Sequence, residues 1–301
     1  MITYRLIPVC LGILLLFGGR VSGQWQDWTN ANQTHRWNDP ENWSTKQIPT
    51  AETDGVALNV LPGPQISKTA AAVKGFVNIG ATRDSQLIIS QGGSLQVETA
   101  VALGCADKVK GMLVMQEGSS LTVDQVYVGT GAKDFGGKGH VVLEGGTINC
   151  AYFAIARGGD LRAEGSLLLK GGTLHCWDFS MSRDCIIPPR ADIWDGKIVQ
   201  SRNDVKRVKD WVHSKWIVAY GGKGKVIVEF DTAEHPGCTV IHAQKKTSEQ
   251  SSNGIISPHI IALATSLFGQ TIEFSGGPNQ HVTATHRRRR EAQFPQWVRV
   301  Q

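Results

Sequence analysis

Long helical patterns are nearly absent from this sequence of 301 residues. Apolar residues rarely recur at the three- and four-residue spacing of an amphipathic helix, which argues against the all-helical and α/β classes. The chain also has no Ser-His-Asp signature, no phosphate-binding loop and no dinucleotide fingerprint. No Cys-x-x-Cys pair occurs, so a zinc site lacks its usual ligands. The inference therefore rests on what recurs in the chain.

A unit of about 25 residues recurs between Gly75 and Asn203. Its first landmark is a short apolar strand, and the copies end at positions 80, 104, 129, 156 and 182, in steps of 24, 25, 27 and 26. Its second landmark is a turn that in most copies contains a Gly pair, at 92–95, 118–121, 145–148, 171–174 and 195–198. Two landmarks that share one period indicate a repeat architecture.

Each unit reads as three short strands joined by short links, with the Gly pair at a sharp corner that requires positive φ. Such units fit a solenoid in which every coil pairs with the next and apolar side chains stack inside. An antiparallel sandwich would also show regular short strands with Gly turns, but it does not require a fixed period. We therefore predict an all-β fold, a single-stranded parallel β-helix that is right-handed, with coils of about 25 residues and short capping elements.

The first 23 residues have the pattern of a bacterial Sec-type signal peptide. Arg5 lies in a short basic region, an apolar run covers residues 6–17, and small residues at 21–23 precede a cleavage site before Gln24. A run of 12 residues is too short to span a bilayer. Cleavage would remove two arginines and no acid, which takes the net charge from +5 to +3 (5 − 2). The sequence thus predicts a secreted protein, extracellular or at the cell surface, with no transmembrane span after cleavage.

Both ends of the repeat region have the composition of caps. Residues 24–74 contain Trp25, Trp28, Trp37 and Trp43, and we assign them to an N-terminal cap and first coil, because the open edge of a first coil would recruit another chain. Exposed tryptophans would instead form a platform for sugar rings. The coils occupy 75–203. Residues 204–245 are expected to form a C-terminal cap, with a short helix near 203–214 and strands at 216–220, 225–230 and 239–243.

The remaining residues, 246–301, are polar and expected to be mobile. They contain a basic run at 287–290, which would either bind an acidic polymer, nucleic acid or a lipid surface or be a solvated charge run. We expect no nucleic acid as a partner.

The N-terminal pattern, Trp followed by Asn42-Trp43-Ser44 and Pro49, with Gly-Gly-Thr coils after it, resembles bacterial secreted β-helix exoproteins. These include autotransporter-passenger-like and pectin-lyase-like proteins, and the resemblance covers about residues 25–245. It implies the β-helix architecture and leaves the activity open, because that group holds adhesins, surface proteins and polysaccharide-degrading enzymes. The chain departs from autotransporters, since nothing after residue 245 resembles alternating barrel strands.

Cys150 and Cys176 occupy the same position in successive coils. Neighbouring coils lie ~4.8 Å apart, a Cα separation that a disulfide accepts, and an exported protein would meet oxidising conditions. A reduced pair that fills the interior, where Val97 and Val123 lie in earlier coils, explains the pattern equally well.

Opposite charges recur in the loop after each Gly-ending strand, and stacked coils would align them as one charged stripe. As an ion-pair ladder, each pair would contribute about 0–1 kcal/mol. As a glycan groove, the basic groups would bind uronate or sulfate, and Asp would hold hydroxyls or Ca²⁺. The glycan-binding candidates are Arg83, Asp84, Asp107, Lys108, Lys133, Asp134, Arg157, Asp160, Arg183 and Asp184, with His175 from an outward polar row formed by Gln96, Thr122, Asn149 and His175.

The function expected from these features is non-enzymatic binding or scaffolding of extracellular or cell-surface polysaccharide. The alternative is a polysaccharide-degrading enzyme, a β-elimination lyase or a glycoside hydrolase, that uses the same stripe. For a lyase, the best local set is Arg157, Asp160, Arg183 and Asp184. The acidic cluster usual for a Ca²⁺-dependent lyase is missing, and no metal or other cofactor is predicted.

Overall fold

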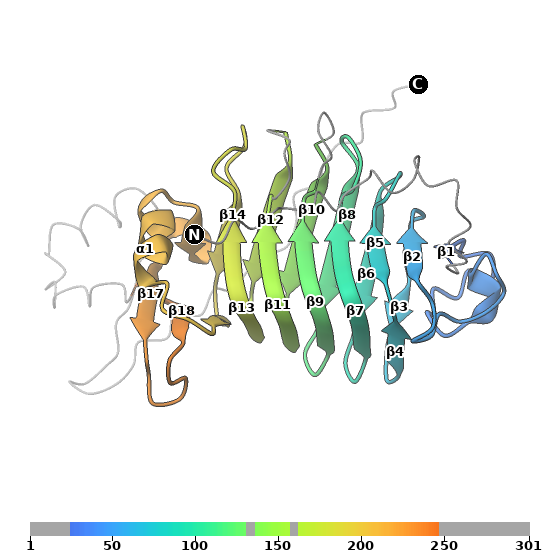
Figure 1. The fold of residues 1–301 in the computed structure, drawn as a ribbon, viewed down its shortest axis with the longest axis horizontal. Coiled ribbons are helices and arrows are strands. Elements are labelled where there is room, and N and C mark those ends of the chain that lie inside the picture. Colours follow the sequence, from blue (N-terminus) through green and yellow to red (C-terminus); the bar gives the residue numbers. More distant parts are fainter. Residues whose placement is uncertain (1–24, 131–135, 157–161, 247–301) are drawn as a thin grey trace, which may run out of the picture. The chain divides into compact units, whose positions relative to one another are not determined.

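The computed structural model describes residues 25–130, 136–156 and 162–246. These residues coil into a parallel β-solenoid of about 7 turns, in which successive coils lie about 26 residues apart (Figure 1). The elements, in chain order, are β1 (Trp25–Trp28), η2 (Pro40–Asn42), β2 (Gly55–Leu58), β3 (Gln65–Ile66), β4 (Ala70–Val73), β5 (Phe76–Ile79), β6 (Ser85–Ile89), β7 (Ser94–Leu103), β8 (Lys110–Met115), β9 (Ser120–Val128), β10 (Lys138–Leu143), β11 (Thr147–Ile155), β12 (Glu164–Leu169), β13 (Thr173–Met181), β14 (Arg190–Ile193), β15 (Lys197–Gln200), α1 (Val205–His213), β16 (Ile217–Ala219), η3 (Tyr220–Gly222), β17 (Lys225–Phe230) and β18 (Thr239–Gln244).

Two sheets form the walls of the solenoid. The 11-stranded sheet has the order β1-β2-β5-β7-β9-β11-β13-β15-β18-β17, with β4 paired to β7, and the 7-stranded sheet has the order β16-β14-β12-β10-β8-β6-β3. Neighbouring strands are parallel except at one end, where β18 runs antiparallel to β15 and β17 antiparallel to β18. The β-solenoid predicted from the repeat is confirmed, and its handedness stays a prediction.

The interior is built from columns of equivalent apolar residues. In the larger sheet, Leu95, Leu121, Ile148, Leu174 and Ile198 are aligned from coil to coil, and all are buried. In the smaller sheet, Leu87, Leu113, Val141 and Leu167 form a similar buried column. Each fully buried side chain of this size contributes roughly 1.5–3 kcal/mol, so the repeat period is also the period of the core.

The prediction of three strands per coil was wrong in one respect. The third strand of one coil and the first strand of the next are a single long strand, as in β9. Along β9 the buried residues are Leu121, Val123, Val126 and Val128, so two consecutive residues face outward between Val123 and Val126. The alternation therefore changes phase inside the strand. A bend of this kind interrupts the two-residue period without interrupting the pairing, so a sequence pattern cannot distinguish it from a strand end.

The Gly corners adopt the backbone that was expected of them. Gly92, Gly118, Gly146 and Gly172 all have positive φ. At Gly172 a Cβ atom would also lie 2.3 Å from the carbonyl oxygen of Gly146 in the coil below. Both the conformation and the space therefore require glycine at this corner.

The first end of the solenoid is closed by aromatic side chains. Trp28, Trp37 and Trp43 are buried, and the ring of Trp43 lies edge-on to both others, with centroid distances of 5.2 and 4.8 Å. Trp25 differs, because 47% of its surface is exposed and it stacks on Phe76. Burial is what a capping role requires and a sugar platform forbids, so three of the four tryptophans belong to the core.

The last coil is covered by α1, β16 and the hairpin of β17 and β18. The helix expected near 203–214 corresponds to α1, and the three strands expected after it correspond to β16, β17 and β18. Trp211 and Val208 of α1 are buried, and Trp211 packs edge-on against Phe179 of β13. Within the described ranges, no helix has the length and apolar character needed to cross a membrane.

Candidate functional site

The described loops of the predicted charged stripe, those after β5, β7 and β13, lie along one edge of the solenoid, where the larger sheet passes to the smaller one (Figure 1). Arg83, Asp84, Lys108, Arg183 and Asp184 are exposed, and Asp107 is partly buried. The other four members of the stripe, Lys133, Asp134, Arg157 and Asp160, lie outside the described residues.

Several described members of the stripe have structural partners. A carboxylate oxygen of Asp84 accepts a 2.8 Å hydrogen bond from the backbone N–H of Lys110 in the next coil. The guanidinium of Arg183 lies 4.0 Å from the carboxylate of Asp210 in α1, with both side chains more than half exposed. Within the described part of the chain, no ion pair joins Arg83 to Asp84, Asp107 to Lys108, or Arg183 to Asp184. The three described pairs of sequence neighbours thus form no ion pairs with each other, and the other two pairs lie outside the described residues.

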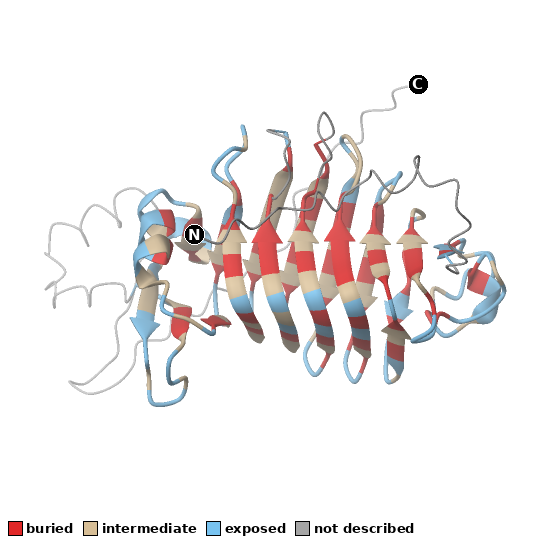
Figure 2. Ribbon diagram, viewed as in Figure 1, coloured by how far each residue is buried: buried red, intermediate tan, exposed pale blue. Residues whose placement is uncertain are grey.

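The polar row is found in register on the outer face of the long strands. Gln96 is aligned with Thr122, Thr122 with Asn149, and Asn149 with His175. A second column lies two residues earlier in each strand and consists of Ser94, Ser120, Thr147, Thr173 and Lys197. Gln96, Thr122 and Asn149 are exposed and the other described members are partly buried. A band of exposed residues crosses β7, β9, β11 and β13 in Figure 2, and the exposed residue of β13 is Trp177, outside both columns. We call these two sets the polar columns.

The two candidate disulfide cysteines are aligned on neighbouring strands, Cys150 on β11 and Cys176 on β13. Both thiols are free in the structure, and the Cys150 thiol lies 3.7 Å from the carbonyl oxygen of His175. Burial raises the pKa of Cys150 to about 12 and holds the pKa of Cys176 well above its usual range. Thiols of this kind are poor nucleophiles at neutral pH, and the disulfide stays a prediction.

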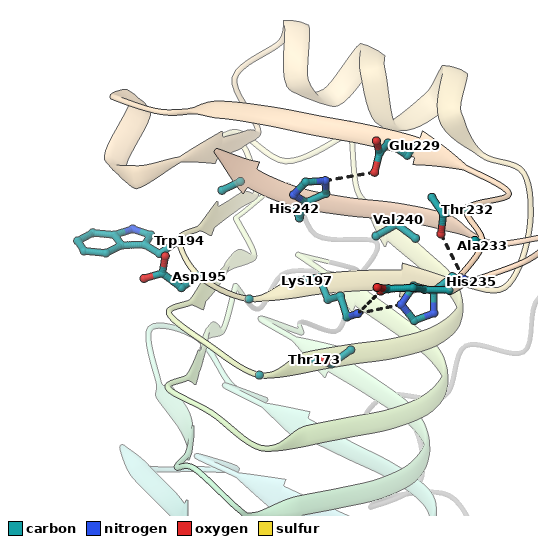
Figure 3. A pocket seen from close by; sticks show the side chains of 14 residues that line it. Thr173, Trp194, Asp195, Lys197, Glu229, Thr232, Ala233, His235, Val240 and His242 are labelled. Carbon is teal, nitrogen blue, oxygen red and sulfur yellow. Dashed lines mark hydrogen bonds and ion pairs between the residues drawn. The ribbon is translucent and has the colours of Figure 1, made fainter. Parts of the chain in front are cut away.

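A groove of about 830 Å³ opens where the hairpin of β17 and β18 folds back against the last coils (Figure 3). The antiparallel pairing of β18 with β15 places the hairpin there. One side is formed by the turns before β13 and β15, and the other by the hairpin and its loop. The lining residues are Gly172, Thr173, Trp194, Asp195, Gly196, Lys197, Glu229, Thr232, Ala233, Glu234, His235, Val240, His242 and Ala243.

Basic groups gather at the loop end of this groove. The ammonium group of Lys197 donates a 2.9 Å hydrogen bond to Nε2 of His235, and it lies 3.7 Å from the carboxylate of Glu234. The ring of His175 lies 6.2 Å from the ring of His235. Burial, and then the nearby His235 and Lys197, lower the pKa of His175 below its ordinary value. The last residues of the two polar columns, Lys197 and His175, therefore lie next to the hairpin loop at this end.

An aromatic pair lies at the opposite end of the groove. Trp194 is 40% exposed, and its ring centroid is 5.8 Å from that of Tyr220. The Tyr220 hydroxyl donates a 2.8 Å hydrogen bond to Asp195, which raises the pKa of Tyr220. The ammonium group of Lys245 lies 5.3 Å from the centre of the Tyr220 ring and 3.8 Å from Asp195. An exposed ring with hydrogen-bonding groups beside it suits a ligand that has both an apolar face and hydroxyls.

Two arginines and two aspartates form a network of ion pairs between the last coils and the start of α1. Asp178 of β13 accepts 2.7 Å hydrogen bonds from both Arg202 and Arg207, and both arginines also contact Asp204. The backbone N–H of Asp204 donates to the Thr239 hydroxyl of β18, so the network reaches the hairpin. These side chains are 15–32% exposed, which makes them stronger partners than surface pairs.

Neither this network nor the groove was predicted from the sequence. Lys197 and His235 are 38 residues apart, and no repeat relates them. The strands at 225–230 and 239–243 were predicted, but their sequence does not indicate that the hairpin pairs with β15. None of the described candidates lines the groove, but the ring of His175 lies 6.2 Å from that of His235, which does. Among the described residues, no group of three or more His, Cys, Asp or Glu side chains is placed to hold a metal ion.

Comparisons of the chain with protein-family models, with curated proteins and with solved structures found no match.

Proposed function

We propose that the protein is a secreted, non-enzymatic solenoid that binds or scaffolds extracellular or cell-surface polysaccharide. The observation that carries this proposal is the continuity of the polar columns with the groove. Hydroxyl, amide and imidazole side chains are aligned over four long strands, and the columns end at Lys197 and His175 beside the open groove.

A repeating surface suits a repeating ligand. Neighbouring strands lie about 4.7–4.9 Å apart, so each coil offers similar hydrogen-bonding groups at a fixed interval along the solenoid. A sugar polymer presents hydroxyls at regular intervals as well, and its rings have apolar faces that stack on exposed aromatic rings. Trp194 at the groove supplies such a ring, whereas Trp28, Trp37 and Trp43 are buried in the cap.

This proposal moves the binding surface from the charged stripe to the polar columns and the groove. Two described stripe residues already have partners, since Asp84 accepts from the backbone N–H of Lys110 and Arg183 lies 4.0 Å from the carboxylate of Asp210. Export by the signal peptide at residues 1–23 and a relationship to the bacterial secreted β-helix exoproteins are parts of the same proposal.

The second candidate is a polysaccharide-degrading enzyme, and one observation favours it. Three carboxylates, those of Asp195, Glu229 and Glu234, line the groove together with histidines. A glycoside hydrolase needs two carboxylates on opposite sides of the scissile bond. Two of the three are already engaged, because Glu229 lies 3.3 Å from His242 and Asp195 accepts from Tyr220, and this favours binding over hydrolysis.

The test is incubation of the exported protein with a panel of uronate, sulfated and neutral polysaccharides. Retention on insoluble glycan, new reducing ends and the ultraviolet absorbance of unsaturated products are measured with and without Ca²⁺. We expect retention without cleavage. Cleavage that is lost in Glu229→Gln or Asp195→Asn would establish the hydrolase instead, and cleavage lost in Arg183→Ala would establish the lyase. Neither retention nor cleavage on any glycan would refute both.

A further inference from the structure

We propose that Lys197, His175 and His235 form a subsite for the anionic group, a carboxylate or a sulfate, of an acidic polysaccharide. This inference rests on the proposed function and names the class of ligand that the groove selects. The three side chains come from three separate elements, β15, β13 and the loop between β17 and β18. Lys197 and His235 line one end of the groove (Figure 3), and the ring of His175 lies beside this end, 6.2 Å from the ring of His235.

The contact between Lys197 and His235 shows why this end suits an anion. A lysine ammonium can only donate, so Nε2 of His235 is unprotonated where it accepts the 2.9 Å hydrogen bond. Protonation of His235 would place two cations in contact, and like charges at this distance repel. An anion between or beside them removes that repulsion. Anion binding and proton uptake by His235 therefore favour each other.

The carboxylates of the groove leave this subsite open. Glu229 pairs with His242, and Asp195 accepts from Tyr220 and lies near Lys245. The remaining acid, Glu234, is 3.7 Å from Lys197, and its side chain is 81% exposed. A pair this exposed contributes little because solvent screens it, so a ligand anion with better geometry can displace Glu234.

The charged groups around the three residues set the direction of the pH dependence. They are Asp195 and Lys197 beside and on β15, His175 on β13, Glu234 and His235 in the loop, Glu229 and His242 on the hairpin, and Lys245 after β18. With the histidines neutral, the three acids that line the groove outnumber the two lysines. Protonation of the histidines reverses that balance, and because burial and the nearby His235 and Lys197 lower the pKa of His175, this happens on the acidic side of the usual imidazole range. Affinity for an anionic glycan should rise as the pH falls through this range and decrease above it.

The experiment compares three oligosaccharides of equal length on the exported full protein: sulfated, carboxylated and neutral. Calorimetric titrations at pH 5 and pH 8, in buffers of different ionisation enthalpy, give both the affinity and the protons taken up. We expect both anionic ligands to bind about tenfold more tightly at pH 5 than at pH 8, with proton uptake, and the neutral one to show no pH dependence. A gain confined to the sulfated or to the carboxylated ligand identifies which anion the subsite takes.

Lys197→Ala should weaken anionic binding about tenfold at both pH values. His235→Gln should abolish most of the pH dependence, and it keeps an acceptor for Lys197. Lys74→Ala is the matched control, because Lys74 is exposed and follows β4, outside the groove. Equal losses in Lys74→Ala and Lys197→Ala would mean unspecific attraction and would overturn the inference. An unchanged pH profile in His235→Gln would overturn it as well.

Inorganic sulfate separates this inference from the proposed function. Shifts of the His175 and His235 imidazole NMR signals on sulfate addition, lost in Lys197→Ala, would support the subsite even if no polysaccharide were retained. Retention of neutral and acidic glycans with equal affinity would support the proposed function and refute the subsite.

Discussion

The two ends of the solenoid are closed differently, although a buried tryptophan packs at both, with Trp211 edge-on to Phe179 at the last end. At the first end, three tryptophans are packed edge to face, and the indole N–H of Trp43 donates a 2.8 Å hydrogen bond to the carbonyl of Trp37. At the last end, the side chains of Arg202, Arg207, Asp178 and Asp204 connect the final coil to α1 and the hairpin. Each arrangement covers the open edge of a terminal coil, but the two caps expose different side chains on their surfaces.

The difference shows how a capping structure acquires a binding surface. The aromatic cap buries its large side chains, so few of them remain to recognise a ligand. In the polar cap, β18 runs antiparallel to β15, and β17 runs antiparallel to β18. Between this hairpin and the last coils lies the groove, which is lined by charged and aromatic groups. The first end therefore serves stability, and the second combines stability with the proposed recognition.

The largest loss in the free energy of unfolding is expected from a substitution in the aromatic cap. Trp43→Ala removes a side chain that has no exposed surface, and loss of a buried Trp costs about 3–5 kcal/mol. We expect this loss in the free energy of unfolding measured by denaturant titration. Trp25→Ala is the control, because Trp25 is 47% exposed and should cost much less. Equal losses in the two variants would contradict the role given to the buried cluster.

The second largest loss of stability is expected from a substitution in the polar cap. Asp178→Asn removes a charge that two arginines share, and we expect a loss of about 2 kcal/mol, less than for a fully buried pair because the site is partly exposed. Asp210→Asn is the matched control, since Asp210 is 57% exposed and 4.0 Å from Arg183. It should change the unfolding free energy by no more than about 0.5 kcal/mol. A stability change in Asp210→Asn as large as that in Asp178→Asn would refute the special role of the network.

A third substitution separates binding from stability. Trp194→Ala should weaken glycan binding about tenfold, or about 1.4 kcal/mol, and leave unfolding nearly unchanged because the ring is 40% exposed. Trp177→Ala removes an equally large ring that is 59% exposed and lies away from the groove lining. Affinity chromatography on the retained glycan would compare the two, and a larger loss in Trp177→Ala would move the binding surface to the bend of the long strands.

The smallest effect tests the polar columns. Asn149→Ala removes one exposed amide among several equivalent side chains, and one such hydrogen bond contributes about 0.5–1.5 kcal/mol. We expect a loss near the lower limit for a long glycan and no loss for a short oligosaccharide that fills the groove alone. A comparable loss with both ligands would argue against a binding surface that extends along the coils.

The repeat made the solenoid predictable, because one period determines both the corners and the core columns. Leu121, Ile148 and Leu174 were recognisable as equivalent before their stacking was seen, and so were the polar partners Asn149 and His175. The bend within β9 was not recognisable, since a change of phase looks like the end of a strand.

The groove could not be predicted for a different reason. It depends on antiparallel pairing between β15 and β18, a contact outside the repeat, and such pairing leaves no period to detect. Lys197 also belonged to the repeat position that carries Ser or Thr in earlier coils, where one basic residue looks like ordinary surface. The charged stripe was visible in the sequence because charge is easy to read, yet Asp84 holds a backbone N–H of the next coil.

The most direct test of the account uses three exposed tryptophans as probes, Trp25 at the first end, Trp177 at the bend and Trp194 at the groove. Protein comprising residues 24–301 is oxidatively labelled with and without a saturating glycan from the panel, and modification of each tryptophan is measured by mass spectrometry. The account predicts strong protection of Trp194 and none of Trp25. Protection of Trp25 with Trp194 left fully reactive would place binding at the aromatic end and contradict the account.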